Sequence, residues 1–138
     1  MFDLHGCGHE NLSREAIESD LEARLAASGW GNRVATVVLN PELEVWVWSD
    51  SPRVAEALGW SGQNIEMRAY LSGKSFLFDQ EGKPANPKGA VEEALKKVKK
   101  TRSASIYLEL GKNVGHRRCT DPAFLKFKST LQSWFPAD

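Results

Sequence analysis

The stretch Val37-Val38-Leu39-Asn40-Pro41-Glu42-Leu43-Glu44-Val45-Trp46-Val47-Trp48-Ser49-Asp50 decides the fold class of this 138-residue chain. It begins inside an apolar run, residues 34–39, which lacks the polar alternation of a half-exposed strand and is typical of a strand buried on both faces. Asn40 is a suitable helix cap, and Pro41 suits a first helical turn because proline has no N–H group to lose there. The stretch therefore predicts a strand that leads directly into a helix.

Acidic side chains after a buried strand make this helix a candidate site. Ligands of open α/β sheets bind at the carboxyl ends of the strands. Glu44 is the main candidate, and Glu42 and Asp50 are weaker ones. We expect the acidic residues of any active site to come from here and from one other strand end.

The composition is that of an ordinary globular protein, with 41% hydrophobic and 26% charged residues. The length predicts a single domain over residues 1–138. Eighteen basic residues balance eighteen acidic ones, so net charge favours no nucleic acid, membrane or acidic partner. No run approaches the roughly 18 apolar residues of a membrane helix, and no signal peptide opens the chain, so we expect a cytoplasmic protein.

A short strand is predicted at the start of the chain, where Phe2 and Leu4 flank Asp3 and glycines follow as a turn. Buried strands usually have about 5–6 residues, and about four remain here. Either this strand is short, or the natural chain starts upstream, or another polypeptide completes it.

A helix is predicted between the two strands, from the cap Ser13 to about Ser28, with Gly29 as a stop. Strand, helix and strand in this order indicate a parallel pair. Three further cap-and-proline pairs predict helix starts at Ser51-Pro52, Asn86-Pro87 and Asp121-Pro122. Residues 65–71 are also interpreted as a helix. Residues 103–114 alternate like a strand and also repeat apolar residues every four positions, and the helical interpretation is preferred because the surroundings are helical. The predicted fold is thus α/β, a short parallel sheet flanked by helices with a mainly helical C-terminal half.

The sequence surroundings of four tryptophans predict two different roles for them. We expect Trp46 and Trp134 to pack inside the protein. Trp48 and Trp60 lie near predicted loops and indicate a docking surface, because aromatic residues concentrate binding energy.

Asp3 and His5 form a candidate metal site together with Glu44. Alternate residues of a strand point the same way, so both side chains can converge on one ion. Carboxylates and an imidazole predict a Mg²⁺ or Mn²⁺ site for phosphoryl transfer. The alternative is that Asp3 is a turn residue at the strand end and His5 a surface imidazole.

The segment from Asp3 to Gly8 resembles the D-x-D-G turn of Toprim domains, with His5 in place of the second aspartate. Residues 41–50 resemble the P-x-x-E-x-W-x-x-x-D helix of Toprim-like proteins in bacterial anti-phage defence loci. Lys83-Pro84, the Ser-Ala-Ser segment from residue 103 and the Arg-Arg-Cys-Thr-Asp-Pro-Ala-Phe run before the last helix extend the likeness. The whole pattern is most similar to the small subunits of methylation-associated defence systems.

The resemblance implies metal-dependent phosphodiester chemistry on nucleic acid, with other defence-system subunits as partners. Asp3 then matches the first metal aspartate and Glu44 the helix glutamate, so these two are the candidate catalytic residues. His5 is a softer ligand, less suited to Mg²⁺, and the chain lacks the earlier strand that carries the general-base glutamate. The alternative is a non-catalytic accessory or scaffold subunit that binds a larger partner through Trp48, Trp60 and a basic helix end.

Two further sets of residues are candidates. Cys7, His9, His116 and Cys119 can form a tetrahedral zinc set, and the alternative is two cytosolic thiols with no common role. The basic run comprises Lys96, Lys97, Lys99, Lys100 and Arg102, with Arg117-Arg118 further on. These side chains can contact phosphates of a nucleic acid, or they form a solvated helix face.

Overall fold

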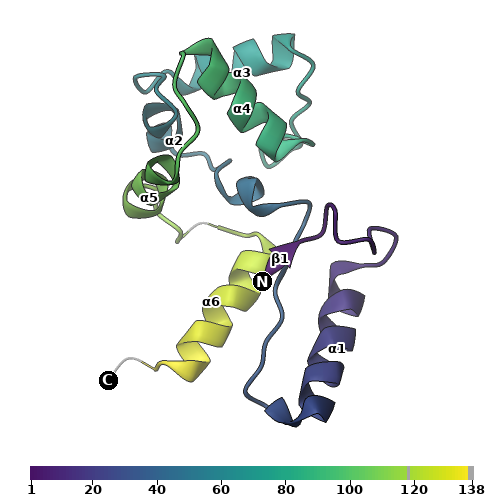
Figure 1. The fold of residues 1–138 in the computed structure, drawn as a ribbon. Helices are drawn as coiled ribbons and strands as arrows, with labels where there is room; N and C mark the ends of the chain where they lie inside the picture. Colours follow the sequence, from purple (N-terminus) through teal and green to yellow (C-terminus); the bar gives the residue numbers. More distant parts are fainter. Residues whose placement is uncertain (118, 137–138) are drawn as a thin grey trace. The chain divides into compact units, whose positions relative to one another are not determined.

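The computed structural model describes residues 1–117 and 119–136, so the basic residue Arg118 lies outside the described part. The chain divides into two compact units (Figure 1). Unit 1 comprises Met1–Leu43 and Cys119–Asp138, and unit 2 comprises Glu44–Arg118. The expectation of a single domain over residues 1–138 stays a prediction.

Unit 1 contains the sheet. Strand β1 (Phe2–Asp3) pairs in parallel with β2 (Val38–Leu39), and Phe2 lies opposite Val38. Helix α1 (Arg14–Leu25) connects them and continues as a π-helical turn, η1 (Ala26–Trp30). Its cap is Ser13, as predicted, because the Ala16 N–H donates to the Ser13 hydroxyl at 3.2 Å. The α/β class and the short parallel pair are therefore confirmed.

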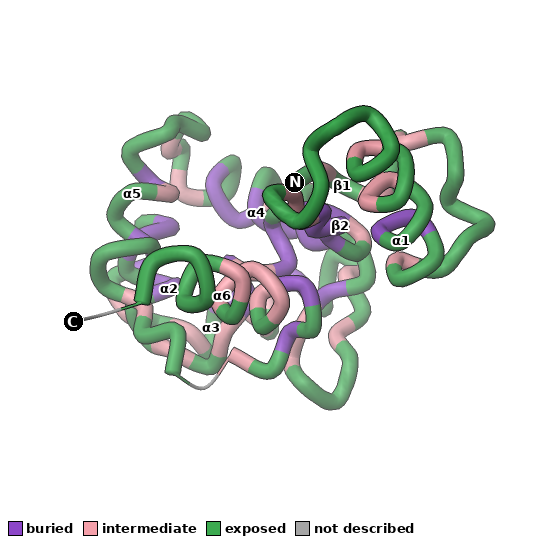
Figure 2. The backbone as a smooth tube through the Cα atoms, turned by 90° about the horizontal axis from the view of Figure 1, so that it is seen from below, coloured by how far each residue is buried: buried purple, intermediate pink, exposed green. Residues whose placement is uncertain are grey.

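Strand β2 is shorter than the predicted strand over residues 34–39, although residues 36–39 are buried (Figure 2). The neighbouring β1 provides only two residues for pairing. On the other side, the N–H groups of Thr36 and Val38 donate to carboxylates of α1 rather than to a strand. The apolar run is therefore buried, but within the described part of the chain β2 pairs only with the two residues of β1, which limits its length.

The predicted helix from Asn40 is wrong. The His5 N–H donates to the Pro41 carbonyl at 2.9 Å, and residues 40 and 41 form a bend after β2 instead of a helical turn. The Asn40-Pro41 peptide bond is cis. A short 3₁₀ helix, η2 (Leu43–Trp46), begins instead at Leu43, whose N–H donates to the Asp3 carboxylate at 2.9 Å. Asp3 thus replaces Asn40 as the side chain that satisfies the helix start.

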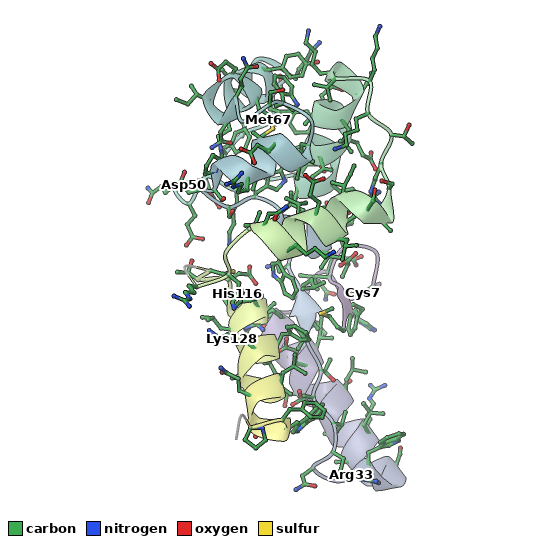
Figure 3. The ribbon with its side chains drawn as sticks, turned by 90° about the vertical axis from the view of Figure 1, so that its left-hand side faces the viewer. Cys7, Arg33, Asp50, Met67, His116 and Lys128 are labelled. Atoms are coloured by element: carbon green, nitrogen blue, oxygen red, sulfur yellow. The ribbon has the colours of Figure 1, made fainter. Side chains whose placement is uncertain are left out.

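Unit 2 is built from helices α2 (Pro52–Ala57), α3 (Asn64–Gly73), α4 (Pro87–Lys97) and α5 (Ala104–Asn113). Ser51 and Asn86 cap α2 and α4 with their side chains, so the predicted starts are confirmed. The helices predicted over residues 65–71 and 103–114 are also present. Their apolar side chains enclose one core, in which Met67 is fully buried (Figure 3).

Trp48 and Trp60 belong to this core, so the predicted docking surface is wrong. They are only 2% and 9% exposed. The Trp48 indole N–H donates to the Pro87 carbonyl at 3.0 Å, and that of Trp60 donates to the Ala94 carbonyl at 3.1 Å. Burial of the rings is favourable because carbonyls of α4 satisfy their only polar groups.

Helix α6 (Pro122–Trp134) belongs to unit 1 and starts at its predicted cap, where the Phe124 N–H donates to the Asp121 carboxylate at 3.0 Å. Ala123 is its buried residue. The expectation that Trp134 packs inside is wrong, because 45% of this residue is exposed. Among the described residues, no helix combines the length and the apolar character that crossing a membrane requires.

Candidate functional site

Three candidate ligands come from the carboxyl ends of the paired strands in unit 1. Asp3 accepts the Leu43 N–H at 2.9 Å, and the His5 Nδ1 lies 3.8 Å from Oε2 of Glu42. Glu42 is buried, whereas the His5 side chain is 76% exposed. Acidic and imidazole side chains therefore lie at this edge of the sheet. The Asp3 carboxylate, however, already accepts a hydrogen bond from a backbone N–H group.

Glu44 lies in unit 2, where it is buried and paired. Its Oε1 accepts hydrogen bonds from the guanidinium of Arg102 and, at 2.9 Å, from the hydroxyl of Tyr107. Arg102 also donates to Tyr107 at 2.8 Å and to Glu92 at 3.2 Å. Burial and the hydrogen bond to Glu44 raise the pKa of Tyr107. Because a guanidinium cation sits on the carboxylate, Glu44 has the bonding of a structural ion pair rather than of a metal ligand.

The candidate metal sets are divided between the units. Asp3 and His5 belong to unit 1 and Glu44 to unit 2, while Asp50 is an exposed residue after η2 (Figure 3). Within residues 1–117 and 119–136, no three or more His, Cys, Asp or Glu side chains are grouped to hold a metal ion. The Mg²⁺ or Mn²⁺ site stays a prediction, and the residues present do not fit it well.

The zinc set is likewise divided. Cys7, His9 and Cys119 belong to unit 1, and His116 follows α5 in unit 2. Both cysteines are free thiols, and the Cys7 sulfur accepts the His9 N–H at 3.4 Å. The local bond explains the Cys7–His9 spacing without a metal, so the zinc site also stays a prediction.

Most of the basic run has partners inside unit 2. Lys100 donates to the Ala57 carbonyl at 2.6 Å, and the Lys97 ammonium lies 5.2 Å from the centre of the Tyr70 ring. Lys96 lies 3.8 Å from Glu93, and Arg102 pairs with Glu44. The remaining residue, Lys99, adopts a left-handed backbone conformation with φ of 56°. Phosphates of a nucleic acid would have to compete with these contacts, and the nucleic-acid site stays a prediction.

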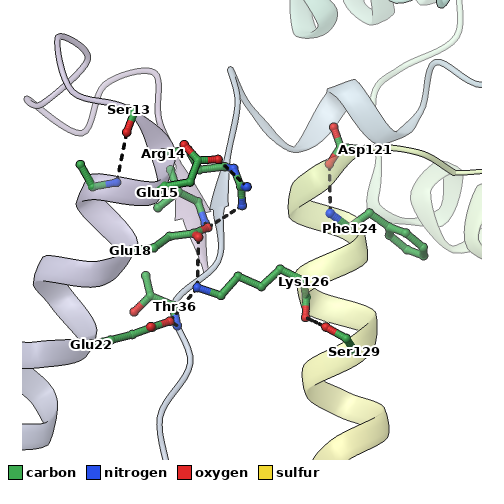
Figure 4. Close-up of polar contacts among 12 residues, drawn as sticks. Ser13, Arg14, Glu15, Glu18, Glu22, Thr36, Asp121, Phe124, Lys126 and Ser129 are labelled. Atoms are coloured by element: carbon green, nitrogen blue, oxygen red, sulfur yellow. Dashed lines mark hydrogen bonds and ion pairs between the residues drawn. The ribbon is translucent and has the colours of Figure 1, made fainter.

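Side chains of α1 and α6 form a polar cluster along the outer edge of β2 (Figure 4). The sequence alone did not predict this cluster. Glu18 accepts the Val38 N–H at 2.9 Å, and Glu22 accepts the Thr36 N–H at 2.7 Å. The ammonium of Lys126 in α6 bridges both carboxylates, at 3.0 and 2.8 Å. Burial raises the pKa of Glu22, but the hydrogen bonds from Lys126 and Thr36 outweigh it and lower this pKa. These carboxylates thus replace a neighbouring strand.

Glu18 and Glu22 are separated by four residues on α1, which is the only local signal for this cluster. That spacing shows that the two carboxylates share a helix face. It cannot show that Lys126 and the β2 backbone meet them, because these partners are distant in the sequence.

The loop after β1 is held together by hydrogen bonds to the carboxylate of Glu10. The N–H groups of Gly6 and Gly8 both donate to Oε1 of Glu10, at 2.8 and 3.3 Å. The two glycines have positive φ angles of 83° and 82°, which other residues rarely adopt. Backbone hydrogen bonds of Glu10, Gly8 and Gly6 lower the pKa of the Glu10 carboxyl.

The end of α6 presents apolar side chains to solvent. Leu131 is 38% exposed, Trp134 45% and Phe135 73%. Leu131 and Trp134 are three positions apart on α6 and therefore lie on the same side of the helix, and Phe135 follows directly as its C-cap. We call these three residues the α6 apolar end.

No protein-family model, curated protein or solved structure matches this chain. The roles of its residues therefore rest on the contacts of the described side chains. The carboxylates of Asp3 and Glu44 are hydrogen-bonded within the protein, whereas the side chains of the α6 apolar end are exposed to solvent.

Proposed function

We propose that this chain is a non-catalytic accessory subunit that binds a larger protein through the α6 apolar end. In accordance with the resemblance to Toprim-like proteins, we infer that the partner is another subunit of a bacterial anti-phage defence system. The observation that carries the proposal is the joint exposure of Leu131, Trp134 and Phe135.

The spacing of Leu131 and Trp134, three positions apart on α6, fits recognition of a helix by an apolar groove. Such helices are held by side chains at positions i, i+3 and i+4, which insert together. Burying one large apolar side chain contributes roughly 1.5–3 kcal/mol, and aromatic residues dominate binding hot spots. A partner of matching chemistry presents an apolar groove large enough for Trp134 and Phe135.

The bonding of the predicted catalytic residues also favours the accessory function. A divalent cation needs carboxylate oxygens that are not already neutralised. The Glu44 carboxylate is bonded to the cationic Arg102 side chain and to Tyr107. Asp3 accepts the first N–H of η2.

The proposal is tested by co-expressing the chain with the proteins encoded beside its gene and measuring complex formation. The double variant Trp134→Ala/Phe135→Ala should weaken the complex at least about tenfold, because both anchors are lost. Leu77→Ala is the matched control, since Leu77 is a 76% exposed apolar residue of unit 2. Equal affinity of the double variant and the wild type, or an equal loss in the control, would contradict the proposal.

Metal-dependent phosphodiester chemistry is the second candidate, favoured by the His5 imidazole and the Glu42 carboxylate, which lie 3.8 Å apart beyond the strand ends. The resemblance supports Asp3 and Glu44 as its catalytic residues, with Mg²⁺ or Mn²⁺. A nuclease assay with each cation, comparing wild type with Glu44→Ala and Asp3→Asn, tests it. Equal cleavage by wild type and Glu44→Ala removes Glu44 from this chemistry.

A further inference from the structure

The loop His5-Gly6-Cys7-Gly8-His9-Glu10 has the geometry of an anion-binding nest. The donors to Oε1 of Glu10 are the N–H groups of Gly6 and Gly8, which are two residues apart. The N–H between them is turned away, because Cys7 donates to the Leu4 carbonyl at 3.1 Å. Backbone N–H groups of a turn that point at one acceptor make concavities that bind anions such as phosphate, and two such groups converge here.

The acceptor now bound to these N–H groups is the carboxylate of Glu10, which belongs to the same loop. Glu10 is exposed, so its carboxylate can turn into solvent without leaving an uncompensated buried charge. A Cβ atom added to Gly6 or Gly8 would meet nothing within 4 Å, so no neighbouring atoms crowd the Cα atoms of these two residues.

We propose that this loop binds a phosphate group, and that the Glu10 carboxylate occupies the nest until an external phosphate displaces it. This site is separate from the α6 apolar end and goes beyond the proposed accessory function. A phosphate has more acceptor oxygens than the single one that Glu10 contributes. His5 and His9 border the two glycines in the sequence, and the His5 Nδ1 lies 3.8 Å from the Glu42 carboxylate.

Titration with inorganic phosphate, followed by the amide NMR signals of Gly6 and Gly8, tests this proposal. Glu10→Ala removes the competing carboxylate and should lower the Kd for phosphate at least about tenfold relative to wild type. Glu10→Gln keeps an acceptor oxygen that can close the loop but lacks the charge, so its Kd should lie between the two. A parallel titration with a 5′-phosphorylated dinucleotide distinguishes a nucleic-acid end from the free ion as the tighter ligand.

Two controls make the result specific. Glu109→Ala changes the net charge equally on an exposed position of α5 and should leave the phosphate Kd of the wild type unchanged. Adding Gly8→Ala to Glu10→Ala should abolish the gain, because an alanine resists the φ of 82° that aims the N–H group. The proposal is overturned if neither Glu10 variant binds phosphate more tightly than wild type, or if Glu109→Ala gains as much.

Discussion

Lys126 of α6 reaches Glu18 of α1, with its ammonium 3.0 Å from the Glu18 Oε2, across 108 positions of sequence. Only 5% of the Glu18 side chain is exposed, so its charge needs compensation inside unit 1. The same carboxylate accepts the Val38 N–H through its other oxygen. The Arg14 guanidinium also donates to Glu18, at 2.9 Å, so Arg14 and Lys126 together compensate this carboxylate, and Lys126 links α6 to α1 beside β2.

Lys126→Ala should lower the free energy of unfolding of unit 1 by about 1–3 kcal/mol, because it removes one of the cations that compensate the buried Glu18 carboxylate and leaves it with Arg14. Thermal or urea unfolding followed by circular dichroism measures this change. Lys128→Ala on the same helix is the matched control and should stay within about 0.5 kcal/mol of wild type. Equal losses in the two variants would show that the Lys126 ion pair contributes nothing specific.

Stability should fall in acid because Glu22 has a lowered pKa in the folded protein. A lowered folded-state pKa stabilises the fold above the ordinary pKa of 4.5, and this contribution is lost as the pH falls through the folded-state value. Urea midpoints measured from pH 6 down to pH 3 should therefore decrease less for Glu22→Gln than for wild type. The same decrease in both proteins would assign the acid sensitivity to other carboxyl groups.

Arg102→Ala should destabilise unit 2 more than Glu44→Gln does. The Arg102 side chain is 39% exposed and can turn to water when Glu44 is neutralised, whereas the Glu44 side chain is only 5% exposed and cannot. We expect a loss of about 2–4 kcal/mol for Arg102→Ala and about 1 kcal/mol for Glu44→Gln. Urea unfolding followed by tryptophan fluorescence measures both. The reverse order would contradict a structural ion pair at Glu44.

Trp48→Phe should cost about 1–3 kcal/mol of stability, since it removes ring volume and leaves the buried Pro87 carbonyl without the donor that the indole supplies. Trp134→Phe changes an exposed ring and should stay within about 0.5 kcal/mol of wild type. Thermal unfolding of both variants is the measurement. A larger loss for Trp134→Phe would indicate that this ring packs within the protein after all.

The local chemistry of the sequence determined most helix starts. At Ser13, Ser51, Asn86 and Asp121 the capping side chain accepts an N–H group two or three residues further along the chain. A bond of that kind depends on the neighbouring residues alone. The parallel strand pair followed equally from the order of two apolar segments around one helix.

Tertiary structure decided what happens after Asn40-Pro41 and therefore the roles of the acidic residues. The same cap-and-proline signal gives no helix there, because His5 and Asp3, remote in the sequence, hold Pro41 and Leu43. Glu44 likewise became one half of an ion pair through Arg102, 58 positions away. No local pattern encodes these partners, since the fold brings them together. The sequence by itself thus determined where acidic side chains occur, and only the tertiary structure decided which cations and N–H groups they bind.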